Sequence, residues 1–357
     1  MRRSRRERSP GVKRGSVDVT ESRSAMGEEP AVGGEIVTPR RGRPKVSARL
    51  AWIAIAPFAA WAVVRLGGLE RGSFLTQLMT ATPYAVVASL VPLLLAVASR
   101  RRLAIAVAVL VTATLAAVVA PRTFAVTQRA ATGPTLRVLS TNLLFGRADA
   151  DAVVDLVRRL RPDVLSAQEL SPAAVLELDE AGLKELLPYR VLQDEFGAGG
   201  SGLYARYPLT EVTGLFEAIG HNMPAARLTL PGGGTVELVA VHTYPPLGPW
   251  TAQWRDGLRA LPSAPSAGPY RILAGDFNAT LDHAEFRALV ARGYVDAGAA
   301  TGNGLVPTWP ANRRVMPPII TIDHVLADRR LAVTGYAVHT LPRTDHRAVF
   351  TEVRLPR

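Results

Sequence analysis

Three apolar segments near the start of the chain restrict its fold more than any other sequence feature. They cover residues 50–66, 77–98 and 103–120 and contain 17, 22 and 18 residues. A helix needs roughly 20 apolar residues to cross the hydrocarbon core of a bilayer. The second segment contains Pro83 and Pro92, which a membrane helix tolerates better than a soluble helix does. A signal peptide is the alternative for the first segment, but no clear cleavage site follows it, so we predict three transmembrane helices.

The basic residues that give the chain its formal net charge of +12 are concentrated beside these segments. Residues 1–49 contain 13 Lys and Arg against 6 Asp and Glu, whereas residues 121–357 contain 24 against 23. Lys and Arg favour the cytoplasmic side of a membrane, so the basic tail and Arg100–Arg102 predict a cytoplasmic N-terminus. Three crossings then place the chain after residue 120 outside the cell membrane. Arg65, near the end of the first span, is expected to extend its side chain to the membrane interface.

Composition divides the chain into four regions. Residues 1–49 are rich in Arg, Ser, Gly and Pro and are predicted to be a disordered tail. Residues 50–120 contain the three spans, residues 121–134 form a linker, and residues 135–357 form the C-terminal domain. The run RRGRPK at 40–45 has a DNA minor-groove hook as its alternative, but such a run before an apolar helix is more often a topology signal or a contact with anionic lipid. The absence of cysteine excludes disulfides and zinc–thiolate sites.

Polar side chains end several apolar strands in the C-terminal domain. The clearest example is YRILAGDFNA at 270–279, where a buried strand is followed by Asp276 and Asn278. Residues two apart in an extended chain lie on the same side, so both can face one cavity. The strand ends together supply Asn142, Glu169, His242, Asp276, Asn278, Asp323, Asp345 and His346. Any one of these is more often a hydrogen-bonded structural residue, but their joint occurrence favours a single polar site.

Alternating and helical apolar patterns predict the other elements of this domain. Helices are expected over 149–161, 171–187, 250–261 and 283–292. Further strands are expected over 189–193, 202–205, 212–216, 226–230, 322–326, 333–338 and 348–353. The strands 226–230 and 236–242 are separated by the turn sequence PGGGT and are predicted to form a hairpin. The alternation of strands and helices indicates an α/β domain.

The order of these motifs resembles the endonuclease/exonuclease/phosphatase superfamily over about residues 135–357. The resemblance is carried by STN at 140–142, QE at 168–169, GDFN at 275–278, ID at 322–323 and DH at 345–346. It implies a four-layer α-β-β-α sandwich of two mixed sheets, here preceded by the three predicted transmembrane helices. It also implies phosphoester hydrolysis with a divalent cation, and carboxylate oxygens suit Mg²⁺ or Mn²⁺.

The resemblance assigns one group of residues to the metal and the phosphate. By this similarity Glu169 is the principal metal ligand, and Asp345 assists it. Asn142 is placed close to the metal and the phosphate, where it binds substrate and contributes to the metal site. Asn278 is implied to donate a hydrogen bond to a phosphate oxygen.

A second group is implied to act on the attacking water and the leaving group. Asp276 orients or deprotonates the water, and Asp323 supports His346. His242 and His346 stabilise the transition state or protonate the leaving group. The sequence departs from the family at two points: Thr321 replaces the Arg or Ser that often precedes Ile-Asp, and no glutamate partner for His242 can be placed. The second departure weakens the assignment of His242 as an acid.

The sequence therefore predicts a membrane-anchored phosphoester hydrolase that acts by metal-assisted attack of water. A nonspecific extracellular nuclease is the alternative. A catalytically silent binding module is less favoured, because Glu169, Asp276 and His346 are all present. A transporter or sensor gains no support, because the interiors of the three spans contain no Asp, Glu or Lys.

Charge gives an expectation about the substrate. A protein that grips duplex DNA needs a basic surface, and the nearly neutral C-terminal domain contains a single lysine, Lys184. We therefore expect a small or lipid-linked phosphoester in preference to nucleic acid, with the membrane as the other partner and no protein partner indicated. A local patch of Arg313–Arg314 with Arg329–Arg330 is the feature that would favour DNA instead.

Overall fold

The computed structural model describes residues 47–128, 130–311 and 317–357. The tail that the sequence predicts to be disordered lies outside the described residues up to residue 46, including the basic run at 40–45. Arg313 and Arg314, which belong to the proposed basic patch, also lie outside them.

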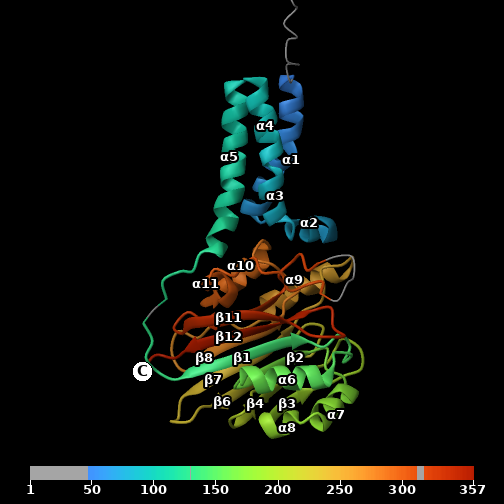
Figure 1. Cartoon of the computed structure of the whole chain (residues 1–357), viewed down its shortest axis with the longest axis vertical. Coiled ribbons are helices and arrows are strands. Elements are labelled where there is room, and N and C mark those ends of the chain that lie inside the picture. Colours follow the sequence, from blue (N-terminus) through green and yellow to red (C-terminus); the bar gives the residue numbers. More distant parts are fainter. Residues whose placement is uncertain (1–46, 129, 312–316) are drawn as a thin grey trace, which may run out of the picture. The chain divides into compact units, whose positions relative to one another are not determined.

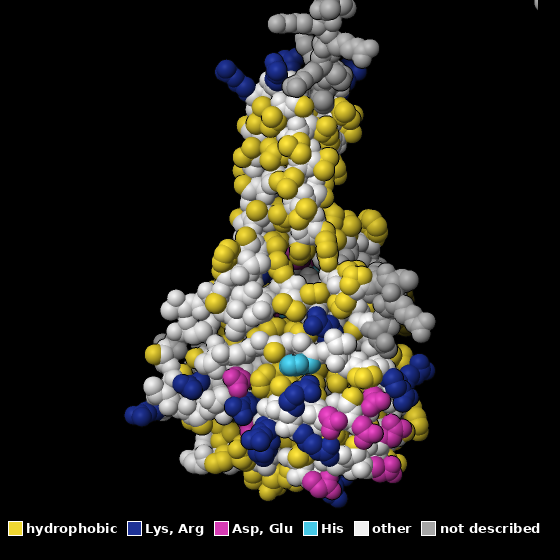
Figure 2. Space-filling view, in the orientation of Figure 1, with side chains coloured by type: hydrophobic (Ala, Val, Ile, Leu, Met, Phe, Trp, Pro, Cys, Tyr) yellow, Lys and Arg dark blue, Asp and Glu magenta, His cyan; other side chains and the backbone are white. Residues whose placement is uncertain are grey.

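The N-terminal part of the described chain is helical. Its helices are α1 (Ala48–Gly67), α2 (Gly72–Met79), α3 (Thr82–Ala88), α4 (Leu90–Ser99) and α5 (Arg102–Val119), followed by the short 3₁₀ helix η1 (Ala120–Thr123). Three helical stretches are long and apolar enough to cross a membrane: Ala48–Gly67, Thr82–Ser99 and Arg102–Thr123. Their outward surfaces expose large apolar side chains, such as Ile53, Leu94 and Leu110, and Figure 2 shows hydrophobic side chains along this segment with basic ones at one end.

The second of these stretches begins later than the sequence predicts. Residues 77–81 belong to the end of α2 and to the turn after it, and Thr82 starts the apolar stretch instead. Pro83 has no N–H with which to continue the hydrogen bonding of α2, and it lies in the first turn of α3, where proline is tolerated. The short helix α2 is therefore separate from the span that follows it, and its Phe74 is 75% exposed.

The C-terminal domain contains two six-stranded mixed sheets. The first has the order β11-β12-β1-β2-β4-β3, formed by β1 (Thr135–Asn142), β2 (Val164–Gln168), β3 (Tyr189–Gln193), β4 (Ser201–Ala205), β11 (Ala332–Thr340) and β12 (Arg347–Arg354). The second has the order β5-β6-β7-β8-β10-β9, formed by β5 (Leu209–Glu211), β6 (Ala225–Thr229), β7 (Thr235–His242), β8 (Tyr270–Asp276), β9 (Tyr294–Asp296) and β10 (Asp323–Asp328). Strands β1 and β2 are parallel, as are β7 and β8, and the other pairs are antiparallel.

Helices cover the outer face of each sheet, and the inner faces pack on each other. Leu139 and Leu165 of the first sheet pack against α6 (Ala150–Leu160), α7 (Pro172–Glu180) and α8 (Leu183–Leu186). The second sheet packs in the same way against α9 (Trp250–Ala260) and α10 (Ala284–Ala291). Between the sheets, apolar side chains such as Val138 and Leu238 form the central core. Figure 1 shows these layers, which confirm the predicted four-layer sandwich.

Several local predictions differ from the structure. No strand forms over 212–216: the edge strand is β5, and Gly214 (φ 70) lies in the turn that follows it. The helix predicted over 171–187 is broken into α7 and α8, because Gly182 adopts a left-handed backbone between them (φ 97). The short elements β9 and α11 (Ala297–Ala300) were not predicted, since each is too short to show a periodic pattern.

The strand register brings the predicted polar residues to one edge of the sandwich. In the first sheet Asn142 is opposite Gln168, at the carboxyl ends of parallel strands. In the second sheet His242 is opposite Asp276 in the parallel pair, and Asp323 is opposite Asp276 at the start of the antiparallel strand β10. Parallel strands end at the same edge and an antiparallel neighbour begins there, so the topology gathers these side chains.

Candidate active site

A cavity of about 470 Å³ lies where these strand ends meet. Six of the eight predicted site residues line it: Glu169, His242, Asp276, Asn278, Asp345 and His346. The other two, Asn142 and Asp323, are buried behind the lining and hydrogen-bond to residues in it. The structure therefore brings all eight residues into one neighbourhood.

Glu169 is held in an unusual backbone conformation directly after β2. Its φ is 53°, in the left-handed region that costs a non-glycine residue about 1–3 kcal/mol. One carboxylate oxygen accepts a hydrogen bond from Asn142 Nδ2 at 3.0 Å, and the other accepts one from the Phe145 backbone N–H at 2.7 Å. Burial raises the pKa of Glu169, and these two hydrogen bonds offset that rise only in part.

Asn142 joins the two sheets through their carboxylates. Its Nδ2 donates to Glu169 in one direction and to Asp276 Oδ2 at 3.2 Å in the other. Its Oδ1 accepts a hydrogen bond from the Leu144 backbone at 2.9 Å. The Asn142 side chain is fully buried. It contacts Glu169, the candidate metal ligand, and Asp276, the candidate base for the attacking water.

Asp276 lies at the end of β8, immediately after Gly275. A side chain at Gly275 would collide with the Val241 carbonyl, so glycine permits the close approach of β7 to β8. Burial raises the pKa of Asp276, the neighbouring Asp323 and Glu169 add to the rise, and His346 opposes it, which leaves the value at about 7. A carboxyl with such a pKa exchanges a proton near neutral pH, as a general base requires.

Asn278 follows Asp276 with a left-handed backbone, φ 46°. Its backbone N–H donates to Asp276 Oδ1 at 2.8 Å, and its Nδ2 donates to the Thr243 carbonyl at 2.9 Å. These two bonds fix the orientation of Asp276 and place the Asn278 side chain on the cavity wall.

His346 and Asp323 form a buried ion pair. The His346 Nδ1 lies 3.0 Å from Asp323 Oδ2, and its Nε2 lies 3.7 Å from Asp276 Oδ2. Burial lowers the pKa of His346, but Asp323 and Asp276 raise it more strongly, to about 10. The imidazole is therefore protonated near neutral pH, with Nδ1–H donated to Asp323 and Nε2–H directed toward Asp276.

His242 has the opposite electrostatic character. Burial lowers its pKa well below the usual value, and His221 and His346 lower it further. Its Nε2 lies 3.9 Å from both Glu169 Oε1 and Asp276 Oδ2. Its ring packs against that of His221, with the ring centroids 4.1 Å apart. Within the described part of the chain, His242 Nδ1 has no hydrogen-bond partner.

Asp345 is the acidic residue on the cavity wall that is most open to a ligand. Trp309 Nε1 donates to its Oδ2 at 3.1 Å, while its Oδ1 is buried and accepts no hydrogen bond among the described residues. A buried carboxylate oxygen of this kind costs free energy unless a cation or water satisfies it.

The donor set fits a hard divalent cation. Glu169 and Asp345 present carboxylate oxygens to the cavity, and such oxygens are the ligands that Mg²⁺ and Mn²⁺ prefer. Asp276, Asp323 and His346 also place ligand atoms within 4.8 Å of one another. A protonated His346 would compete with a cation for this cluster, so Glu169 and Asp345 are the stronger candidates for binding one.

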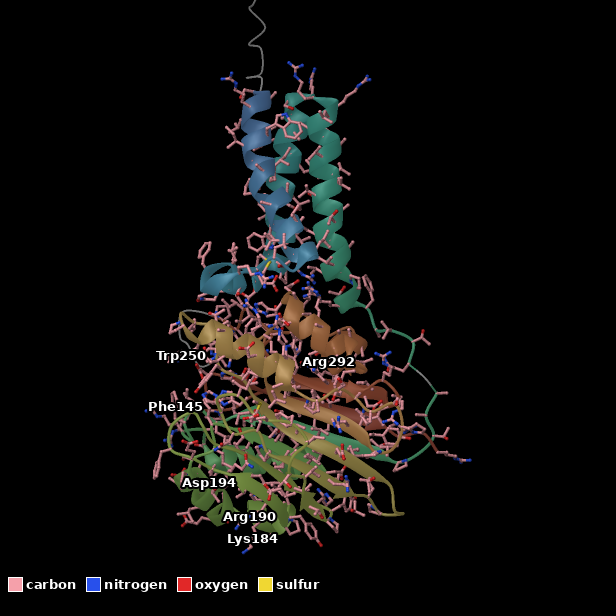
Figure 3. The ribbon with its side chains drawn as sticks, turned by 180° about the vertical axis from the view of Figure 1, so that it is seen from behind. Phe145, Lys184, Arg190, Asp194, Trp250 and Arg292 are labelled. Carbon is pink, nitrogen blue, oxygen red and sulfur yellow. The ribbon has the colours of Figure 1, made fainter. Side chains whose placement is uncertain are left out.

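The sequence did not predict the aromatic part of the cavity wall. Phe145, His221, Tyr244, Trp250 and Trp309 all line it. Phe145 is 44% exposed and Trp250 is 49% exposed, and Figure 3 shows both at one edge of the domain. Trp309 Nε1 donates a hydrogen bond to Asp345 Oδ2. Trp250 begins α9 and the others lie outside the regular helices and strands, so their positions depend on tertiary contacts and no local pattern marks them.

The model of the endonuclease/exonuclease/phosphatase family matches residues 139–346, which is more than half of the chain. The chain belongs to this family. Members of the family are hydrolases that act on phosphoester bonds, and the match contains all eight predicted site residues.

Several solved structures are similar to part of the chain at low sequence identity. An endonuclease/exonuclease/phosphatase protein from Beutenbergia cavernae is 19% identical, with a TM-score of 0.49, over 62% of this chain and 72% of its own. TDP2 from D. rerio, complexed with a single-strand DNA product, is 18% identical, with a TM-score of 0.47, over 62% of this chain and 99% of its own. Sphingomyelinase C from Streptomyces griseocarneus is 17% identical, with a TM-score of 0.42, over 61% of this chain and 99% of its own. No curated protein matches the chain at the significance required.

Proposed function

We propose that the protein is a membrane-anchored, divalent-metal-dependent phosphoester hydrolase whose catalytic domain works outside the cytoplasmic membrane. The observation that carries this proposal is the single cavity in which Glu169, Asp345, Asp276 and His346 meet. Two acidic residues there suit a cation, a third has a pKa near neutrality, and the histidine is cationic. Hydrolysis of a phosphoester requires all of these functions in one place.

In the proposed reaction Asp276 orients and deprotonates the attacking water. Its two oxygens accept hydrogen bonds from Asn142 and Asn278, so the carboxylate has a fixed direction before substrate arrives. Because its pKa is about 7, it is a stronger base than an ordinary aspartate. Fixed geometry and a matched pKa are the two requirements for a general base.

His346 is proposed to stabilise charge on the phosphate or to protonate the leaving oxygen. Asp323 binds Nδ1 and leaves Nε2–H available on the cavity side. His242 is neutral near pH 7 because its pKa is strongly lowered, so we propose that it orients the phosphate by a hydrogen bond. Asn278 is proposed to donate to a phosphate oxygen when substrate displaces its bond to Thr243.

The divalent cation, when bound, neutralises the phosphate and polarises it toward attack. Glu169 and Asp345 would bind it, with Asn142 holding Glu169 in place. Asp345 is positioned in turn by Trp309. A bound cation would compensate the several buried carboxylates of this site, which outnumber its cationic groups.

The orientation in the membrane follows from the basic residues around the three candidate spans. Arg100, Arg101 and Arg102 are exposed at the turn between the second and third spans. We propose that this end faces the cytoplasm and that the domain after residue 120 lies outside. C-terminal alkaline phosphatase and fluorescent-protein fusions test this orientation. A fluorescent but phosphatase-silent fusion would contradict it.

We propose small or lipid-linked phosphoesters as the substrate class. The residues that line the cavity include aromatic and aliphatic side chains but, among the described residues, no Lys or Arg. Lys184 and Arg190 are at the lower end of the domain in Figure 3, away from Phe145 and Trp250. Such a wall suits one phosphate with an apolar or aromatic substituent better than a polyanionic duplex.

A nuclease remains the second candidate because of the same aromatic wall. Exposed aromatic side chains such as Phe145 and Trp250 can stack on the bases of a single strand. The two candidates differ in their response to salt, since binding to several phosphates weakens steeply as salt rises. Nicking of a plasmid that is faster than hydrolysis of small phosphodiesters and steeply salt-dependent would favour the nuclease.

The direct test uses the full-length protein in detergent with bis(p-nitrophenyl) phosphate as the probe. We expect turnover with Mg²⁺ or Mn²⁺, loss of turnover in chelator, and recovery when the cation is returned. Glu169→Gln should bind the cation more weakly and need a higher Mg²⁺ concentration for activity. Glu177 is an exposed acid on α7, so Glu177→Gln serves as the matched control. Full activity in chelator would contradict the metal-dependent mechanism.

A further inference from the structure

A buried cluster of charges joins the helical segment to the catalytic domain. Arg65 Nε, near the end of α1, donates to Asp282 Oδ1 at 2.8 Å. Arg122, in η1 after α5, binds both oxygens of Asp282 at 2.6 and 2.7 Å. All three side chains are buried. The sequence did not predict this contact between Arg65 and the domain.

Backbone and side-chain bonds reinforce this cluster. The His283 ring donates from Nε2 to the Thr76 carbonyl at 2.9 Å, because its Nδ1 accepts the Thr280 N–H. The Glu70 carboxylate accepts the Ala284 N–H. The helical segment therefore contacts residues 282–284 through α1, the loop after it, α2 and η1.

Residues 282–284, which the helical segment contacts, directly continue the loop that contains Asp276 and Asn278. Asp276 and Asn278 lie only a few residues before Asp282, and the chain between them is tied internally. The Asp282 N–H donates to Thr280 Oγ1 at 3.2 Å, and His324 Nε2 lies 2.9 Å from the Ala279 carbonyl. The short turn between Asp276 and Asp282 is therefore held by several hydrogen bonds, through which a displacement at Asp282 would reach the cavity.

A second loop of the cavity is held by the same part of the chain. Ser73 of α2 donates to the Pro246 carbonyl at 3.0 Å and accepts the Gly248 N–H at 3.0 Å. The flanking residues Pro245 and Trp250 line the cavity. The helical segment thus binds both loops that follow the parallel strands β7 and β8.

We infer that Arg65 and Arg122 are positioning residues for catalysis, and that the membrane anchor is part of the active-site scaffold rather than a passive tether. The inference rests on the proposed hydrolase function. Its physical basis is that a buried aspartate needs compensating cations, and both of these come from the ends of predicted spans. Displacement of a catalytic group by about 1 Å can cost on the order of 10²-fold in rate.

The test uses the full-length protein in detergent and three variants. Arg65→Ala/Arg122→Ala removes both cations, and the triple variant with Asp282→Ala also removes the carboxylate that they compensate. Arg190→Ala, which removes a partly exposed ion pair with Asp179, is the control. For each we measure kcat and KM for bis(p-nitrophenyl) phosphate, the Tm, and the hydrogen exchange of peptides covering 276–284.

In Arg65→Ala/Arg122→Ala we expect kcat to fall by about 10- to 10²-fold with little change in KM, and exchange over 276–284 to rise. The triple variant should recover Tm, because no uncompensated charge remains buried, while kcat stays low and exchange stays fast. Arg190→Ala should match the wild type. Recovery of kcat together with Tm in the triple variant would overturn the inference, as would unchanged exchange in the double variant. If the wild type hydrolyses no phosphoester, the proposed function fails, whereas the exchange measurement still tests the coupling.

Discussion

Asp276 and Asp282 lie at the two ends of one loop and are both buried, yet their electrostatic surroundings are opposite. Asp276 lies among the acidic residues Asp323 and Glu169, and its pKa is raised to about 7. Burial raises the pKa of Asp282 too, but Arg122 and Arg65 reverse that effect, so its pKa is lowered. The Asp276 carboxylate can still bind a proton or a cation, whereas both oxygens of Asp282 are already paired with Arg65 and Arg122. One loop therefore combines a carboxylate that we propose to be reactive with a structural one, and their charge partners separate the two proposed roles.

The largest expected effect is the loss of protein stability when Asp282 is replaced. Asp282→Asn leaves Arg65 and Arg122 buried without their carboxylate, and breaking a buried pair in this way costs about 3–5 kcal/mol. Thermal unfolding of the full-length protein in detergent measures the loss. Asp179→Asn, which breaks a partly exposed pair with Arg190, is the control and should cost at most about 1 kcal/mol. Equal losses in the two variants would show that the buried cluster has no special role.

The next largest expected effect is the loss of turnover when Asp276 is replaced. Asp276→Asn keeps the shape of the side chain but removes the base, so kcat should fall by about 10²-fold or more. The affinity for Mg²⁺ should change little, because the cation is assigned to Glu169 and Asp345. Steady-state kinetics across a range of Mg²⁺ concentrations separates these two quantities. A variant with near-native turnover would remove Asp276 from the catalytic role.

Glu169→Gln should act mainly on the metal. Mutation of groups that only support metal ligands costs about 10- to 100-fold in affinity or activity, and a direct ligand should reach at least that range. We expect the Mg²⁺ concentration needed for half-maximal activity to rise accordingly, with the fold intact by circular dichroism. Glu177→Gln should leave that concentration unchanged. An unchanged requirement for Mg²⁺ in Glu169→Gln would place the cation elsewhere.

The smallest effect distinguishes the two carboxylates by the sign of their pH dependence. A carboxyl whose pKa rises from 3.8 to about 7 on folding destabilises the folded state as pH increases through that window. In metal-free protein, Asp276→Asn should therefore raise Tm relative to the wild type, more at about pH 8 than at about pH 5. A difference in Tm that is constant with pH would contradict the raised pKa of Asp276.

Asp282 should behave in the reverse sense. Its folded pKa is below the unfolded value, so its stabilisation is present above the unfolded pKa and is lost as pH falls through the folded one. The stability difference between wild type and Asp282→Asn should accordingly shrink only in acid.

The fold and the gathering of the candidate site residues in one cavity could be predicted from the sequence because their signals are local. Apolar strands that end in Asn142, Glu169, His242 or Asp276 are visible as short motifs, and the family order relates them to one another. The three apolar stretches are equally plain in composition. The partition of α2 from the second span was missed because apolar residues continue through both helices, and only the position of Pro83 distinguishes them.

The features that could not be predicted depend on contacts between distant parts of the chain. Arg65 and Asp282 are separated by 217 residues, and nothing near either one indicates its partner. The same holds for Trp309, which bonds Asp345, and for His221, which packs on His242. Sequence position alone suggested only that the Arg65 side chain reaches the membrane interface, and it gave no sign of the buried acid with which Arg65 is paired.

The most direct test of the account is the location of Mn²⁺ in crystals of the full-length protein, found by anomalous scattering. We expect one cation or a close pair of cations at the carboxylates of Glu169 and Asp345, and none at Asp282, whose oxygens are occupied by Arg65 and Arg122. Absence of Mn²⁺ from the cavity at a concentration that supports full turnover would contradict the central claim that this is a metal-dependent phosphoester hydrolase.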